Sequence, residues 1–118
     1  MPKTLHADTN RLFKAFSDET RLRLLHLLRA GEVCVCDLVD TLRIPQPTAS
    51  RHLALLRRAG LVAARKDGLW CYYSLTPARG KLHEKLIECL ESCRHELPVL
   101  ALDAARMKKV RKARACCE

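Results

Sequence analysis

The chain has 118 residues, the size of one domain, and 48% of them are hydrophobic, which is enough to form a core. Only 4% are aromatic, so leucine, valine and alanine must build most of that core, and a mainly helical fold is expected. No apolar run reaches the roughly 20 residues of a membrane span, and no apolar stretch of a signal peptide follows residues 1–4. We therefore expect a cytoplasmic protein with no membrane partner.

The formal net charge is +9, and residues 103–118 alone hold six Lys or Arg side chains against two acidic ones. A basic excess on a small domain favours a polyanionic partner, usually nucleic acid. On charge alone, a basic surface without such a partner has equal weight. The seven cysteines are an odd number, and a chain without a signal peptide is not expected to be a disulfide scaffold. Reduced thiols for metal binding, redox sensing or packing are the better interpretation.

Apolar residues recur at helical spacing through the first part of the chain. They predict a short helix over residues 6–16, with Phe13 pointing into the core. A second helix is expected to start after Ser17 as its N-cap and to end at Gly31. The second part of residues 32–42 predicts a short third helix.

A tight turn at residues 43–46 precedes a fourth helix, which Pro47 begins and Gly60 ends. Two strands then flank the turn pair Asp67-Gly68. Short helix, turn, polar-faced helix and two-stranded hairpin follow one another as in a winged helix-turn-helix. The expected fold is mainly α with a small β-hairpin wing.

The rest of the chain is helical again. Thr76 as N-cap and Pro77 as first residue predict a long helix, which Pro98 ends or kinks before a further helical stretch. We divide the chain into a winged helix-turn-helix domain, residues 1–105, and a basic tail that contains cysteine, residues 106–118.

Candidate DNA-binding residues gather on the fourth helix and on the hairpin. The major groove admits one α-helix, and the free N–H groups of a helix N-terminus attract phosphate. The candidates are the polar side chains near that N-terminus and the basic pair before the hairpin tip, namely Gln46, Thr48, Ser50, Arg51, His52, Arg65 and Lys66. An ordinary solvated face is the alternative for the set, and a packing or capping role is the alternative for His52.

Cys34 and Cys36 are candidate metal ligands at the start of the third helix. Within a regular helix they would point about 200° apart, because each residue turns the chain by about 100°. If Cys34 is the N-cap, its dihedrals are not helical and the two thiols can converge, with Asp37 at the third helical position as in a capping box. A helix N-terminus favours thiolate, the form that binds soft ions. Packing as small buried hydrophobes is the alternative.

Four segments together resemble the ArsR/SmtB family of metal-responsive repressors. They are residues 17–21 (SDETR), 32–38 (EVCVCDL), 46–57 (QPTASRHLALLR) and 68–75 (GLWCYYSL). The resemblance covers roughly residues 10–97. It implies a homodimer joined by its terminal helices, so that the first domain also carries dimerisation. It further implies binding to double-stranded operator DNA when metal-free, release on metal binding, and control of a metal or arsenic resistance operon.

Within the family, residues 34–38 resemble arsenite- and antimonite-responsive members, which often carry a third cysteine where this chain has Val39. The resemblance thus implies trivalent arsenic or antimony as inducer, and no cofactor for DNA binding. Trivalent arsenic commonly takes three sulfurs, so a third ligand is needed beside Cys34 and Cys36. The candidates are a non-protein thiol, water, and the cysteines of a late helix and of the tail, namely Cys89, Cys93, Cys116 and Cys117.

Other readings remain open at this point. Cadmium and lead sensors of the family usually add cysteines from an N-terminal extension, and none precedes Cys34 here. Zinc sensors use acids and histidines on the last helix, but Lys81 stands where an acid is wanted, so His83 and His95 are interpreted as surface or interface residues. A redox sensor would use the late cysteine pairs, with Cys71 left to packing. A thiol enzyme is not expected, since no Cys-x-x-Cys motif and no Cys-His-Asn/Asp set is evident.

Overall fold

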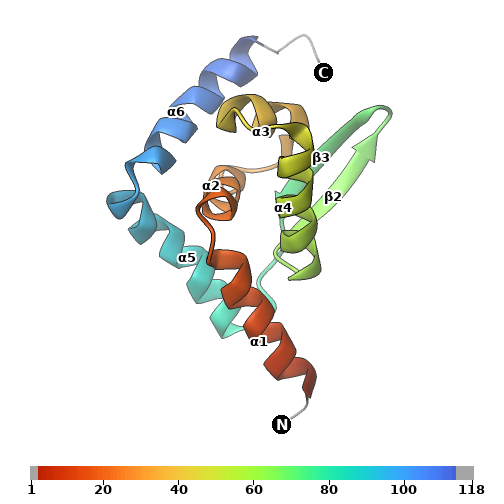
Figure 1. Ribbon diagram of the computed structural model, residues 1–118, viewed down its shortest axis with the longest axis vertical. Helices are drawn as coiled ribbons and strands as arrows, with labels where there is room; N and C mark the ends of the chain where they lie inside the picture. The colour runs from red at the N-terminus through yellow and green to blue at the C-terminus, as the bar shows by residue number, and fades with distance from the viewer. Residues whose placement is uncertain (1–2, 114–118) are drawn as a thin grey trace.

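A computed structural model of the chain describes residues 3–113, with side chains from residue 8 onward. Its elements are α1 (Lys3–Phe16), α2 (Glu19–Leu28), β1 (Val33–Cys34), α3 (Val35–Leu42), α4 (Gln46–Arg58), β2 (Val62–Asp67), β3 (Trp70–Leu75), α5 (Lys81–Glu96) and α6 (Pro98–Ala113). α5 and α6 run along one side of the molecule, α3, α4 and the β2–β3 hairpin form the other, and α2 lies between them (Figure 1). The expected fold, mainly α with a small hairpin wing, is confirmed. None of the described helices is both long and apolar enough to span a membrane.

The core is built around α2, whose leucines face both sides of the fold. Leu24, Leu25, Leu27 and Leu28 are at most 1% exposed. The leucines of α4 that the spacing places inward, Leu53 and Leu56, are fully buried as well. The expectation for Phe13 is wrong, because its side chain is 52% exposed on α1. With so few aromatic residues, the core is an interdigitated set of leucines, as the composition indicates.

The wing is a three-stranded antiparallel sheet in the order β1-β3-β2. β1, in which Val33 pairs with Tyr73 and Cys34 with Tyr72, is not among the elements predicted from the sequence. The hairpin turn also lies one residue later than predicted, since Asp67 still pairs with Trp70. Gly68, with φ +63°, supplies the left-handed backbone that such a two-residue turn needs.

Two predicted helix starts are wrong, the first because of a local hydrogen bond and the second because of a distant one. The N-cap of α2 is Asp18, whose carboxylate accepts from the Arg21 N–H, while Ser17 donates its hydroxyl to the Lys14 carbonyl at the end of α1. α5 begins at Lys81 rather than at Pro77. Thr76 does not cap it, because its hydroxyl donates to the Gly60 carbonyl at 2.6 Å and ties the chain to the end of α4.

α6 runs without a break through the boundary expected after residue 105. Asp103 is completely buried and accepts two hydrogen bonds from the Arg23 guanidinium of α2, at 2.8 and 2.9 Å. Arg106 donates to the Thr41 carbonyl of α3 at 2.9 Å, and Met107 is buried. α6 therefore joins α2 to α3, and its residues beyond 105 pack against the fold through Arg106 and Met107. Cys116 and Cys117 lie outside the described residues.

Arg23→Met should destabilise the chain strongly, because it leaves the buried Asp103 carboxylate without its guanidinium partner. Breaking a buried pair in this way costs about 3–5 kcal/mol of unfolding free energy. Urea unfolding of Arg29→Met is the matched control, since Arg29 pairs with the half-exposed Glu91 and its loss should cost far less than the loss of Arg23. Equal losses in the two variants would contradict a structural role for the Arg23–Asp103 pair.

Candidate nucleic-acid interface and thiol pair

α4 presents a polar face to solvent at its N-terminal end. Pro45 is its N-cap in extended conformation, and no side chain caps the first turn. Gln46, Ser50 and Arg51 are exposed and Thr48 is half-buried, while Ala49 is buried beneath them. Pro47 has no N–H, and the N–H groups of Thr48 and Ala49 donate to the Pro45 carbonyl, so the exposed side chains are what this end of α4 offers to an anion.

The turn that delivers α4 depends on Arg43, which the sequence analysis does not single out. Arg43 ends α3 with φ 57° and ψ 44°, and its N–H donates to the Val39 carbonyl. A residue with a side chain adopts this left-handed conformation at some cost, so the turn is held by its surroundings. α4 is therefore oriented by the end of α3.

His52 is engaged inside the chain. Its Nδ1 is 3.2 Å from Nη1 of Arg21, and Arg21 also donates to the carbonyls of Ala15 and Lys14 at the end of α1. A guanidinium can only donate, so His52 Nδ1 accepts and Nε2 carries the proton of the neutral ring. Arg21 thereby links α1, the start of α2 and α4.

The two basic residues of the wing differ in their surroundings. Arg65 donates two hydrogen bonds to the Glu32 carboxylate, at 2.9 and 2.7 Å, and stacks over the Tyr72 ring. The pairing lowers the pKa of Glu32 and raises the pKa of Arg65. Lys66 is exposed beside it. Arg65 thus ties the hairpin to the segment that leads into β1.

Cys34 occupies two elements at once. It is the last residue of β1 and the N-cap of α3, with φ −68° and ψ 141°, so the expected N-cap position is confirmed. Cys36 lies in the first turn of α3, and Asp37 follows at the third helical position. Both cysteines are half-buried, and the Cys34 side chain makes no capping hydrogen bond. Two thiols at the start of one helix are the donor chemistry that a soft ion requires.

No third donor joins this pair within residues 3–113, where no group of three or more His, Cys, Asp or Glu is placed to hold a metal ion. Cys89 and Cys93 lie one turn apart on α5, with their Sγ atoms 3.9 Å apart. Burial, followed by the contact with Cys89, raises the pKa of the Cys93 thiol. Cys71 is half-buried in β3, opposite Lys66 of β2.

The histidines of α5 differ from each other. His83 is only 3% exposed within the chain, so its interpretation as a surface or interface residue is wrong. Its Nδ1 accepts from the Arg79 N–H, and burial, together with the Arg79 charge, lowers its pKa. His95 is exposed, as expected. Within the described residues, His83 is a packing residue at the start of α5.

Comparisons with known proteins agree with this geometry. The family described as "Bacterial regulatory protein, arsR family" matches residues 18–64. The arsenical resistance operon repressor of Escherichia coli (strain K12) is 48% identical over 86 residues, which are 72% of this chain and 74% of the relative. A cadmium resistance transcriptional regulatory protein CadC homolog of Staphylococcus aureus is 44% identical over 69 residues, 58% of this chain and 57% of the relative.

The structural likeness covers the same elements. The homodimeric winged helix-turn-helix DNA-binding domain Mb0332 of Mycobacterium bovis, described as a possible ArsR-family regulator, has a TM-score of 0.66 and 30% identity. The likeness covers 80% of this chain and 84% of that one. These matches are to transcriptional regulators rather than enzymes. With its helix-turn-helix, its wing and its match to the E. coli repressor, the chain belongs to the arsR family of bacterial regulatory proteins, which are DNA-binding transcriptional repressors.

Proposed function

We propose that the chain represses transcription as a homodimer on double-stranded operator DNA, and that it dissociates when Cys34 and Cys36 bind trivalent arsenic or antimony. The observation that carries the proposal is the double position of Cys34 at the end of β1 and the N-cap of α3. The name of the E. coli relative, an arsenical resistance operon repressor, supports the choice of inducer. The proposal has the protein act in the cytosol, where thiols stay reduced.

Operator reading is assigned to the solvent face of α4. Ser50 and Arg51 project from it next to Gln46 and Thr48, and a helix of this kind fits the major groove. Lys66 of the wing is exposed and suited to a phosphate. Arg65 is paired with Glu32. For Arg65 to contact DNA, this ion pair must either open or lie exposed at the edge of the DNA groove.

The switch acts through the backbone at Cys34. For Cys34 and Cys36 to grip one ion, the extended residue and the first helical turn must adjust to each other. Cys34 pairs with Tyr72 of β3, so the adjustment reaches the wing. α3 ends at Arg43, which sets the start of α4, so the adjustment also reaches the reading helix. A shift from 1:99 to 99:1 between two states needs about 5.5 kcal/mol of differential affinity, which thiolate–ion bonds can supply.

In this proposal a group other than Cys34 and Cys36 supplies the third ligand of the inducer. Cys89 or Cys93, Cys116 or Cys117 of either subunit, a non-protein thiol or water can complete the coordination. The cadmium-related relative keeps cadmium and lead as the alternative inducers, since their ions also prefer thiolates. Titration of the DNA complex with arsenite, antimonite, cadmium, lead and zinc ranks them.

The reading role of α4 is tested with Arg51→Ala. A duplex selected by the wild-type chain from a random library serves as operator, and an unselected duplex serves as reference. A lost base contact is worth about 1–3 kcal/mol, so affinity for the selected duplex should fall roughly 5- to 150-fold, with a smaller loss on the reference. Lys109→Ala, a basic residue exposed on α6, is the control and should keep the preference. An equal loss on both duplexes contradicts a base-reading role.

The thiol switch is tested with Cys36→Ser, which should bind the selected duplex as the wild type does and no longer release it with arsenite. Cys71→Ser, a half-buried cysteine of β3, should release normally and controls for the general effect of losing a thiol. Anisotropy of the labelled duplex during an arsenite titration measures both. Normal release by Cys36→Ser removes the Cys34–Cys36 model. Release of the wild type by peroxide without any metal favours redox sensing instead.

A further inference from the structure

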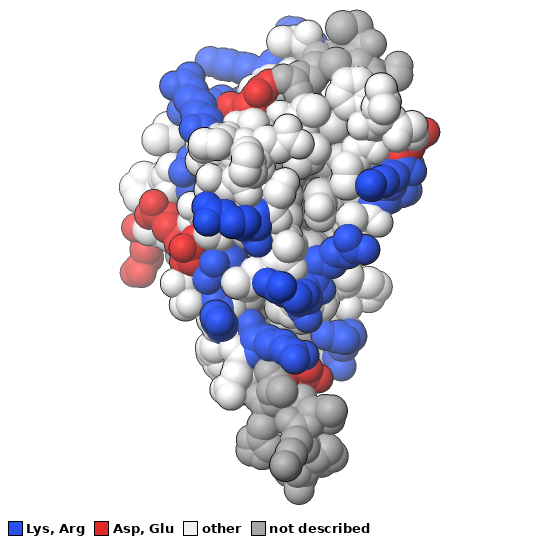
Figure 2. Space-filling model, turned by 45° about the vertical axis from the view of Figure 1, so that its right-hand side comes forward, with Lys and Arg blue, Asp and Glu red and all other residues white. Residues whose placement is uncertain are grey.

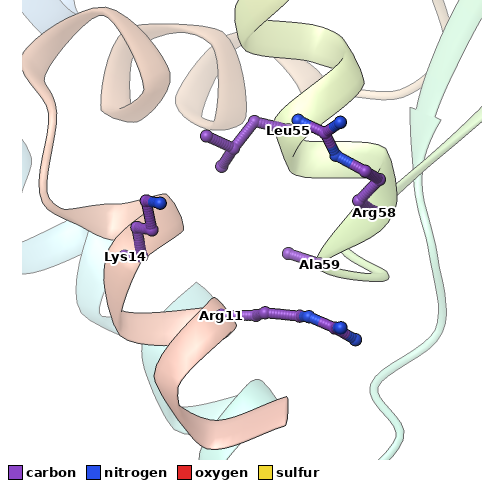
Figure 3. A pocket seen from close by; sticks show the side chains of 5 residues that line it. All are labelled: Arg11, Lys14, Leu55, Arg58 and Ala59. Atoms are coloured by element: carbon purple, nitrogen blue, oxygen red, sulfur yellow. The ribbon is translucent and has the colours of Figure 1, made fainter. Parts of the chain in front are cut away.

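The polar face of α4 continues into a hollow between the end of α4 and α1. Arg11, Lys14, Leu55, Arg58 and Ala59 line this hollow, whose volume is about 420 Å³ (Figure 3). The basic side chains come from both of its walls, Arg11 and Lys14 from α1 and Arg58 from α4. Leu55 and Ala59 give it an apolar floor. None of the described lining residues is acidic.

Two further hollows adjoin the first and share Arg58 with it. One is lined by Arg51, His52 and Leu55 among others, and the other by Arg57 and Tyr73. Figure 2 shows Lys and Arg side chains gathered on the lower part of this face of the molecule. We call the continuous surface from Arg51 to Arg11 the basic groove. It runs from the reading face of α4 along that helix to α1.

Helix geometry aligns the cations of the basic groove. Arg51 and Arg58 are seven residues apart on α4, which places them on one face about 10 Å from each other along the axis. Arg11 and Lys14 are three residues apart on α1 and also share a face. The groove thus carries a row of cations that begins at the reading residues and leads away from them.

The arginines that α4 contributes to the basic groove differ from the arginines that join elements of the fold, because their side chains have no partner among the described residues. Arg23, Arg29 and Arg65 are each paired with a carboxylate. The side chains of Arg51, Arg57 and Arg58, by contrast, have neither a hydrogen bond nor an ion pair with any described residue. Two acids lie near the groove: Asp8 is 3.7 Å from Arg11, with both side chains exposed, and Asp18 is 4.0 Å from His52. Neither reaches Arg58, so its guanidinium is available to an external anion.

We propose that Arg11, Lys14 and Arg58 bind the phosphodiester backbone of DNA beside the segment that α4 reads. The inference rests on the proposed binding of DNA through α4. Guanidinium groups match phosphate oxygens in a bidentate geometry, and an apolar floor of Leu55 and Ala59 leaves room for the sugar-phosphate chain. Such contacts position a protein on the duplex and carry no sequence information.

The test is the salt dependence of DNA binding by the double variant Arg11→Gln/Arg58→Gln. Each lost phosphate contact makes the negative slope of log K against log salt shallower by about 0.9. The slope of the double variant, measured between about 50 and 200 mM salt, should therefore be shallower by roughly two per protomer. The loss should be equal on the selected and the random duplex, which leaves their affinity ratio unchanged. Lys14→Gln alone, should the double variant not fold, is expected to lose about one unit.

Lys108→Gln/Lys109→Gln is the matched control, because it removes the same charge from the exposed face of α6. A slope change no larger than that of the control overturns the inference, and so does an altered ratio between the two duplexes. If the wild type binds inorganic phosphate but the variant shows no change of slope, the groove is a site for a small anion. This outcome also overturns the inference. A wild type that binds both duplexes with the same affinity contradicts operator reading but leaves the slope test intact. A wild type that binds neither removes both proposals.

Discussion

The backbone of Cys34 is the constraint around which the rest of this molecule is arranged. An N-cap residue must leave the helical conformation, and an edge-strand residue must be extended; Cys34 satisfies both with φ −68° and ψ 141°. The same residue therefore ends the short strand that pairs with the wing and begins the helix that precedes α4. Any ligand that changes the dihedrals at Cys34 changes two elements, β1 and α3. β1 pairs with the wing and α3 precedes α4, and the wing and α4 carry the residues that face DNA in the proposed complex.

A change at Cys34 is transmitted through α3 only if the other end of α3 is held in place. α6 supplies the hold, since Arg106 bonds the Thr41 carbonyl near the end of α3 and Asp103 is clamped by Arg23 of α2. Arg21 does the same for α4, joining His52 to the last carbonyls of α1. The buried Asp103 carboxylate is costly unless paired, which makes the Arg23–Asp103 link close to all-or-none. We infer that strain introduced at Cys34 is passed to the wing and to α4 rather than absorbed by loose packing.

Sequence reasoning predicts the parts of the fold that local chemistry decides. The leucine spacing of α2, Pro47 at the start of α4 and Gly68 in the hairpin each carry their signal within a few residues, and the N-cap position of Cys34 does so too. It fails where a distant partner decides. β1 has two residues and exists only because β3 lies beside it, about 40 residues later. Thr76 has the chemistry of a helix cap, but its hydroxyl donates to the Gly60 carbonyl instead. Arg23 and Asp103 are 80 residues apart, and the sequence around neither residue indicates that they pair.

The distribution of charge follows the same division between structure and function. The formal charge of +9 shows that cations exceed acids, but it does not show which of them are already neutralised. Arginines that hold elements of the fold together have carboxylate or carbonyl partners inside the chain, as Arg23, Arg65 and Arg106 do. Those on the outer face of α4 have none, and their repulsion is tolerated because water screens it. A duplex that approaches this face releases its counterions and replaces the missing partners. The unpaired arginines, rather than the net charge, therefore define the surface that binds DNA in this proposal.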